Sequence, residues 1–444
     1  MKGSESQKWS VNFIDGYFEY ILSLYKKEEL SPKCYMDLLI IISDAIDYLK
    51  DPVWEEVGYS ICKKIKEEIE RDGINPYRIG MFGSLGRQAF AVDLYNKNTG
   101  NLKKFSLSLN DLLIKIASKR AQMLLEEKPS TYASHYDCIG GISGILSYLV
   151  DTEIGKKQEE LLFPLVRYLT SLTDKYQYKK EQVLRFHIPK ANLYTDFERK
   201  LYPNGHLNFS LSHGMLGPLI ALGKAKRNGI ELKGMNEAIN TIQELYNRYE
   251  TMQNQKVVWP CYISPREYYY NLKPKYASLL KIQRSSWCYG NVSVARGLQL
   301  VARYCNDYLN EQKYKSYLTD IIDAPTTSYH LDNPGLCHGY ASMLAIGSYF
   351  YSENKSNRLN APIDRCVLES KNIFYENGLK STSEIIDQYF EADVSLLQGA
   401  GGFVAGLLEF ILHDRDFGRL LMINDESRFL YAKKNGLISS FAFF

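Results

Sequence analysis

A short glycine motif that recurs along the chain limits its possible folds more than any other feature. The motif is Gly-x-x-Gly or Gly-x-x-Ser at the start of an apolar helical segment, and it occurs six times. The copies are Gly83–Gly86, Gly141–Gly144, Gly214–Gly217, Gly290–Ser293, Gly339–Ser342 and Gly399–Gly402. The first glycines of consecutive copies are 49 to 76 residues apart, which leaves room for one helical hairpin per copy. Recurrence at this spacing indicates stacked helical units.

The small residues of the motif predict how these units assemble. The first and fourth positions of a helix lie on one face, where glycine or serine lets two backbones approach closely. We therefore expect the motif helices to converge on one axis, with outer helices wrapped around them. This is an all-α fold, an α/α toroid spanning residues 1–444. An open α-solenoid is the alternative, whereas a doubly wound sheet would need a regular alternation of strands and helices that the sequence lacks.

One stretch, residues 175–208, interrupts the repeating pattern between the second and third copies. It contains seven Lys or Arg, three Asp or Glu and six Phe or Tyr residues. We interpret it as an inserted extension, either a small subdomain that docks a peptide or a solvated irregular loop.

Composition narrows the classes of partner and the cellular compartment. The 54 basic and 51 acidic residues give a net charge of +3, which argues against nucleic acid as the main partner. The N-terminal sequence MKGSESQKWS lacks the profile of a secretory signal, and no apolar run is long enough for a transmembrane segment. These features predict a cytoplasmic protein. Its eight cysteines form no Cys-x-x-Cys pair, so we expect free thiols or metal ligands and not disulfides.

Reactive side chains stand directly before three of the repeat glycines. They are His213, the pair Cys288 and Tyr289, and the pair Cys337 and His338. Asp137 lies four residues before Gly141. If equivalent glycines surround one axis, these side chains meet at one end of the toroid.

Two of these cysteines and one histidine form a candidate metal site. Thiolate and imidazole are the ligands that tetrahedral zinc prefers, so Cys288, Cys337 and His338 predict one Zn²⁺. Three protein ligands leave a fourth position open, as in catalytic zinc sites. The alternative is that each cysteine is a small apolar core residue.

The remaining candidates surround this site. His213 is a candidate fourth ligand or general acid or base, or else a structural histidine. Asp137 is a candidate partner of His213, or else caps a helix. Arg284 is a candidate partner of Asp137 or of a substrate carbonyl, or else forms a surface salt bridge. Trp287, next to Cys288, is predicted to contact substrate.

These residues lie in stretches that resemble a known family. The stretches are Tyr136-Asp137 with GGISG, YPNGHLNFSLSHGMLGP at 202–218, RSSWCYG at 284–290 and GLCHGYA at 335–341. With the glycine repeats, they make the chain similar to the lanthionine synthetase C-like family, the lanthipeptide cyclases, from about residue 10 to 420. The resemblance implies an α/α toroid with one zinc held by Cys288, Cys337 and His338.

The resemblance also implies roles for the other candidates. Residues matching Asp137, His213, Arg284 and Tyr289 act around the metal, and an extension at 175–208 engages the leader of a precursor peptide. The length is similar to that of the stand-alone cyclases of class I systems. The cytoplasmic enzyme works either alone or in an assembly with a dehydratase and an exporter, through which it would be peripheral to the membrane.

The function we predict is a thioether-forming cyclase. A zinc-activated cysteine thiolate of the precursor adds to dehydroalanine or dehydrobutyrine, with His213 as acid and Arg284 or Tyr289 near the enolate oxygen. The alternative is a zinc-stabilised helical scaffold that binds peptides or small thiols without turnover. A toroidal glycosidase is disfavoured, because it needs paired carboxylates and only Asp137 has a position linked to the repeats.

Overall fold

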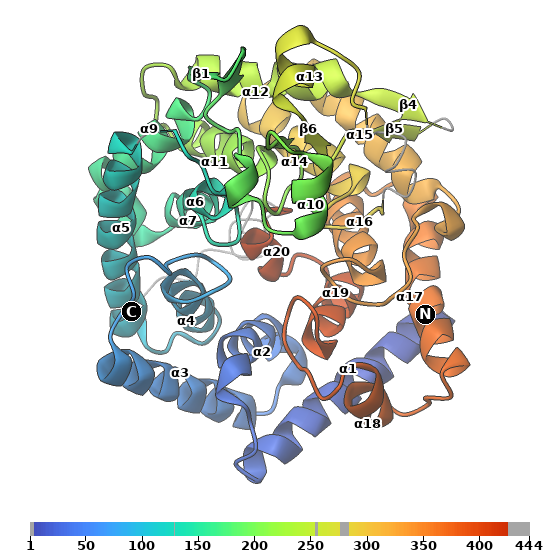
Figure 1. The fold of residues 1–444 in the computed structure, drawn as a ribbon. Helices are drawn as coiled ribbons and strands as arrows, with labels where there is room; N and C mark the ends of the chain where they lie inside the picture. The colour runs from blue at the N-terminus through green and yellow to red at the C-terminus, as the bar shows by residue number, and fades with distance from the viewer. Residues whose placement is uncertain (1–3, 128, 254–255, 276–283, 425–444) are drawn as a thin grey trace.

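Two concentric rings of helices make up the protein (Figure 1). The structure is a computed structural model, and it describes residues 4–127, 129–253, 256–275 and 284–424. The inner ring consists of α2 (Tyr35–Leu49), α4 (Leu85–Thr99), α7 (Ile142–Leu149), α11 (Leu216–Arg227), α14 (Asn291–Tyr304), α16 (Tyr340–Asn354) and α19 (Ala400–Leu412). The outer ring consists of α1 (Glu5–Lys26), α3 (Val53–Asp72), α5 (Lys103–Glu126), α9 (Phe163–Ser171), α12 (Met235–Tyr249), α15 (Tyr308–Asp323) and α17 (Asn360–Glu376).

The rings are closed, which confirms the predicted α/α toroid and excludes the open solenoid. Helix α2 packs against both α4 and α19, and α1 packs against α17 and α19. The two ends of the repeating structure therefore meet. Inner helices are buried on nearly every side, as α19 shows from Ala400 to Glu409, whereas α1 buries one stripe that includes Phe13, Tyr17 and Ile21. This is the burial expected of core and surface helices respectively.

The first glycine of a motif copy fits its place for a reason that differs from the prediction, whereas at the fourth position a Cβ on Gly402 would lie 2.8 Å from Leu336 of the preceding unit. A Cβ atom on Gly290 would lie 2.3 Å from the carbonyl oxygen of Arg284, and one on Gly339 would lie 2.2 Å from that of Asn333. In both cases the obstacle is the loop before the same helix, and not a neighbouring helix as we expected. Gly83 is an exception, because a Cβ there would meet no atom within 4 Å.

A chain of backbone hydrogen bonds links the loops in front of successive inner helices. The N–H of Cys138 donates to Ser212 O at 3.3 Å, Ser212 to Cys288 O at 3.5 Å, Cys288 to Cys337 O at 3.3 Å, and Cys337 to Leu397 O at 3.1 Å. These residues therefore occupy equivalent positions in successive loops. The bonds hold the loops together at one end of the toroid.

The extension predicted at 175–208 is an ordered substructure and not an irregular loop. It contains the antiparallel hairpin of β1 (Lys175–Tyr178) and β2 (Glu181–Leu184), then α10 (Asp196–Leu201) and β3 (Leu207–Asn208). A second stretch, which the sequence did not indicate, completes it. There β6 (Tyr262–Ile263) pairs with β3, α13 (Pro265–Tyr270) packs on β2, and β4 (Thr251–Gln253) pairs with β5 (Lys256–Val258).

A C-terminal segment fills the middle of the toroid at the opposite end. Helix α20 (Phe417–Leu420) lies near the centre of the ring in Figure 1. The carboxylate of Asp44, in the last turns of α2, accepts the N–H groups of Asp416 and Phe417 at 2.8 and 2.9 Å. The remaining short helices are α6 (Ala133–Tyr136), α8 (Glu153–Lys157) and α18 (Thr382–Glu384). Among the described helices, none combines the length and apolarity that crossing a membrane requires.

Candidate functional site

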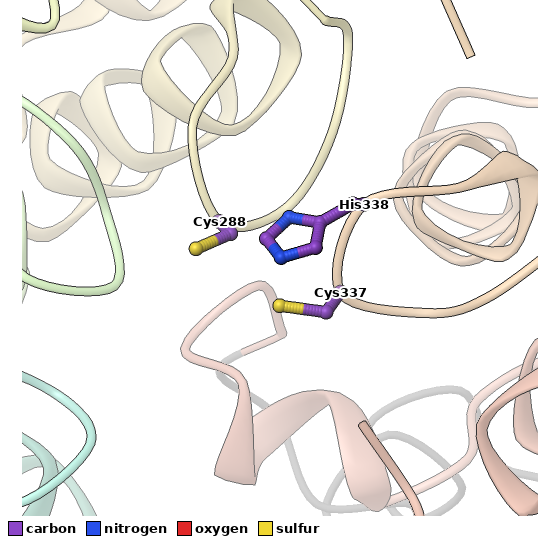
Figure 2. Close-up of side chains that lie close together, drawn as sticks. All are labelled: Cys288, Cys337 and His338. Carbon is purple, nitrogen blue, oxygen red and sulfur yellow. The ribbon is translucent and has the colours of Figure 1, made fainter. Parts of the chain in front are cut away.

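The loops before α14 and α16 bring two thiols and an imidazole together. The ligand atoms of Cys288, Cys337 and His338 all lie within 4.8 Å of one another. Figure 2 shows the three side chains gathered between these two loops. Cys288 and Cys337 are only 5% and 6% exposed. The cluster is therefore a possible metal site that is largely shielded from solvent.

Local backbone structure allows neighbouring Cys337 and His338 to face the same space. Both residues precede the helix, because α16 begins at Tyr340 with Gly339 as its N-cap. The two side chains are thus not constrained to helical spacing. The bond from Cys337 N–H to Leu397 O and the bond from Cys288 N–H to Cys337 O fix the loop on both sides.

Electrostatics within the cluster suit it to a cation. A hydrogen bond from Cys337 holds the pKa of the Cys288 thiol below its ordinary value, although burial opposes this. The same contact raises the pKa of Cys337. Burial and then the charge of Arg284 lower the pKa of His338, so its imidazole is neutral and free to bind a metal. The Cys288 thiol thus loses its proton at a lower pH than an ordinary cysteine, and a divalent cation would favour loss of the second proton.

The donor set fits zinc, the metal that the sequence predicts. Two sulfurs and one imidazole nitrogen are ligands that Zn²⁺ accepts. Ser212 lies beside them, with its Oγ 3.0 Å from Cys288 Sγ. We did not single out Ser212 in the sequence, although it shares the loop position of Cys138, Cys288 and Cys337.

A charged pair lies next to this cluster. His213 directly follows Ser212, and its Nδ1 is 2.7 Å from Oδ2 of Asp137. The other carboxylate oxygen, Oδ1, accepts the N–H groups of Ile139, Gly140 and Gly141 at 3.1, 2.7 and 2.9 Å. Asp137 therefore both binds His213 and ties the loop before α7. It does not cap α7, whose N-cap is Gly141 without a side-chain hydrogen bond, so the structure agrees with the predicted partner of His213 and not with the alternative helix cap.

The pair sets the protonation state of the histidine. Burial favours neutral imidazole, but the hydrogen bond and negative charge of Asp137 outweigh it and raise the pKa of His213. The His213 side chain is 25% exposed, so part of the imidazole is open to solvent. A raised pKa lets the imidazole keep its proton to a higher pH than an ordinary histidine does, which suits a general acid.

Tyr289 and Arg284 border a cavity of about 230 Å³ beside the cluster, which His338 also lines. The Tyr289 hydroxyl accepts a hydrogen bond from Asn208 Nδ2 at 3.3 Å. Burial, followed by the charge of Cys288, raises the pKa of Tyr289, which keeps the phenol protonated. Arg284 pairs with Asp332 at 2.7 Å and not with Asp137, contrary to one of the alternatives weighed from the sequence.

Trp287 is placed differently from the other candidates. Its side chain is fully buried, and its indole N–H donates to the carbonyl of Leu421 in the C-terminal segment at 2.9 Å. Trp287 shares its loop position with Leu336 and Leu396, which are also buried. We therefore assign Trp287 a packing role in place of the predicted contact with substrate.

Comparisons with known proteins agree with this architecture. The family model described as lanthionine synthetase C-like protein matches residues 38–422. Nisin biosynthesis protein NisC of Lactococcus lactis subsp. lactis is 24% identical over 276 residues, which are 62% of this chain and 60% of that protein's length. The solved structure of nisin cyclase shares the fold, with a TM-score of 0.78 and 18% identity over 93% of this chain and 98% of that chain. The chain belongs to the lanthionine synthetase C-like family.

Proposed function

We propose that the protein is a zinc-dependent lanthipeptide cyclase. It would join cysteine thiols of a dehydrated precursor peptide to dehydroalanine or dehydrobutyrine and so form lanthionine or methyllanthionine rings. The observation that carries the proposal is the position of the Cys288, Cys337 and His338 cluster beside the Asp137–His213 pair. Membership of the family and the similarity to NisC support it.

In this proposal Cys288, Cys337 and His338 hold one zinc ion. When bound, zinc keeps a substrate thiol deprotonated and therefore nucleophilic near neutral pH. Two thiolates and one neutral imidazole offset the charge of the ion. Such sulfur-rich ligation favours a sulfur nucleophile over activated water, which favours thioether formation over hydrolysis.

The protein's own side chains supply the proton that the addition requires and stabilise the negative charge that it generates. As the substrate sulfur bonds to the β-carbon, the π electrons of the carbon–carbon double bond move toward the carbonyl and form an enolate. Protonated His213, held by Asp137, then donates its proton to the α-carbon, and the C=O bond is restored. The thiol proton released earlier replaces that of His213 through solvent, so atoms and charge balance.

Two further residues are proposed to stabilise the enolate. Tyr289 remains a neutral donor because its pKa is raised, and Arg284 lines the same cavity. A phenol or guanidinium donor near the developing negative charge is the arrangement that lowers such a barrier.

The proposed partner is the precursor peptide with its leader, for which residues 175–208 are the proposed docking region. A dehydratase and an exporter are proposed partners in a cytoplasmic assembly at the membrane.

A synthetic peptide with one cysteine and one dehydroalanine tests the proposal. We expect the protein to consume the thiol without a change in peptide mass, so that N-ethylmaleimide no longer labels the product. Protein stripped with a chelator should lose this activity and regain it with zinc. A free-thiol count that stays unchanged with zinc-loaded protein would favour the non-catalytic scaffold, and full activity of the stripped protein would refute zinc dependence.

A further inference from the structure

One segment of the extension reaches the proposed reaction centre directly. Tyr194, just before α10, packs against His213 with ring centroids 5.2 Å apart and planes inclined by 60°. This edge-on geometry is favourable for aromatic rings. Helix α10 lies on the side of the inner ring that faces the viewer in Figure 1. The extension therefore forms one wall of the site and is not confined to the rim of the toroid.

A single carboxylate holds this wall in place. Glu198 is 9% exposed and accepts the N–H groups of Tyr194 and Thr195 through Oε2, at 3.0 and 3.2 Å. With Thr195 it forms a capping box at the start of α10. Its other oxygen, Oε1, accepts the hydroxyl of Tyr262 at 3.0 Å. A capping role uses only the first oxygen, so the bond to Tyr262 needs a separate explanation.

Tyr262 links the same carboxylate to a second proposed catalytic residue. Its ring packs against Tyr289 with centroids 5.9 Å apart. It also pairs in register with Asn208 across strands β6 and β3, and Asn208 in turn donates to the Tyr289 hydroxyl. Tyr289 is thus held by two residues of one strand pair, and Glu198 anchors one of them.

We propose that Glu198 is a positioning residue, which holds Tyr194 against His213 and Tyr262 against Tyr289. The extension then completes the reaction centre, in addition to any docking of a leader. The inference rests on the proposed function for its catalytic meaning, while the positions of Tyr194 and Tyr262 can be tested without it. The Glu198 carboxylate accepts hydrogen bonds from three groups on two segments, so it can hold both segments in place. Removing it would leave these three donors without their acceptor.

Glu267 offers a matched control. It is also a buried capping-box glutamate, which accepts Ser264 N–H at 2.6 Å at the start of α13. Its other oxygen, Oε1, accepts the N–H of Lys275. Glu198→Ala and Glu267→Ala therefore each remove a capping-box contact and a second hydrogen bond from a short helix of the extension. Only the first touches the proposed site. Glu198→Gln is the rescue variant, because glutamine supports a capping box and its amide can donate to the Tyr262 oxygen.

Two measurements decide the inference. The first is kcat and KM for ring closure of the synthetic cysteine–dehydroalanine peptide. We expect Glu198→Ala to lower kcat about tenfold with little change in KM. Glu198→Gln and Glu267→Ala should stay close to the wild type, and all variants should retain their metal. The second is the rate at which diethyl pyrocarbonate modifies His213, followed by peptide mass spectrometry, which should rise in Glu198→Ala alone because Tyr194 no longer covers the ring.

The inference is overturned if Glu198→Ala matches Glu267→Ala in either measurement, or if the glutamine variant is as impaired as the alanine variant. A wild-type protein without ring-forming activity would refute the proposed function. The labelling of His213 would still decide whether Glu198 positions the wall.

Discussion

Replacing Asp137 by asparagine would separate the two tasks that its carboxylate performs. Oδ1 ties the loop before α7 by accepting three backbone N–H groups, and Oδ2 binds His213 at 2.7 Å. An amide oxygen can take over the first task, since Asn208 and Asn333 each accept the N–H of the residue two positions further on. It cannot take over the second, because the amide nitrogen that would replace Oδ2 is a donor and carries no charge.

The expected loss of rate follows from this one contact. A hydrogen bond to a charged group contributes about 1.5–3 kcal/mol, which corresponds to roughly 10- to 100-fold in rate. In the serine-protease triad the equivalent replacement lowers kcat by about 10⁴ because the histidine adopts the wrong tautomer. His213 is partly exposed to solvent, which can supply alternative partners, so we expect a loss nearer 10- to 100-fold.

The assay is the initial rate of ring closure, with metal content and the free energy of unfolding measured in parallel. Asp393→Asn is the control, because Asp393 accepts the N–H of Ser395 in the loop before α19 without contacting a histidine. We expect Asp137→Asn to keep its zinc and its free energy of unfolding but to lose most of its rate of ring closure. Asp393→Asn should keep its zinc, its stability and its rate. Equal rates for the two variants would show that His213 does not depend on the carboxylate.

Three further predictions concern the metal, the core and acid stability. Cys288→Ala and Cys337→Ala should each lose zinc, measured by elemental mass spectrometry, whereas the buried thiol of Cys62 lies outside the cluster and Cys62→Ala should retain it. Trp287→Phe leaves the buried Leu421 carbonyl without its donor, so the free energy of unfolding should fall by about 1–3 kcal/mol while KM for peptide is unchanged. An altered KM would restore Trp287 as a substrate contact. Burial opposes ionisation of Glu353, but the charges of Arg296 and Arg303 hold its pKa at about 2. A lowered carboxyl pKa stabilises the fold above the ordinary value of 4.5, and this stability is lost as the pH falls toward 2. In urea titrations Glu353→Gln should therefore be less stable than the wild type at pH 7, and the gap should close below pH 4; a constant gap would contradict this.

The repeating motif predicted the inner ring and the grouping of Cys288, Cys337 and His338 because both depend on local structure. Each glycine stands where a loop turns back on itself before a helix, so the side chains directly before it occupy equivalent places. This is why Cys288, Cys337 and His338 could be grouped although the loops are far apart in sequence. Ser212 obeys the same rule and could have been found by aligning the copies residue by residue.

Other features depend on contacts that no local pattern records. Helix α2 completes the inner ring, but it begins after Cys34 without a glycine motif. Tyr194 packs against His213, and Glu198 binds Tyr262, which lies 64 residues further along the chain. The sequence left open whether Asp137 binds His213 or caps a helix, because the contact joins two loops that are far apart in the chain. The residues at the equivalent loop position, Trp287, Leu336 and Leu396, are buried and apolar, so the repeat pattern did not indicate a carboxylate there.

The parallel arrangement of the inner helices gives the toroid two electrically different ends. The loops that carry the thiols precede helix N-termini, whose partial positive charge stabilises nearby anions by about 0.3–1 kcal/mol each. At the other end, cations meet helix carbonyls: Lys224 Nζ donates to Ser147 O in α7, and Arg415 Nη1 donates to Asp44 O in α2, both at 2.8 Å. Helix polarity thus favours thiolates at Cys288 and Cys337 and basic side chains at the C-terminal segment. Because the helices are held in parallel by the ring itself, this preference acts on both thiols together.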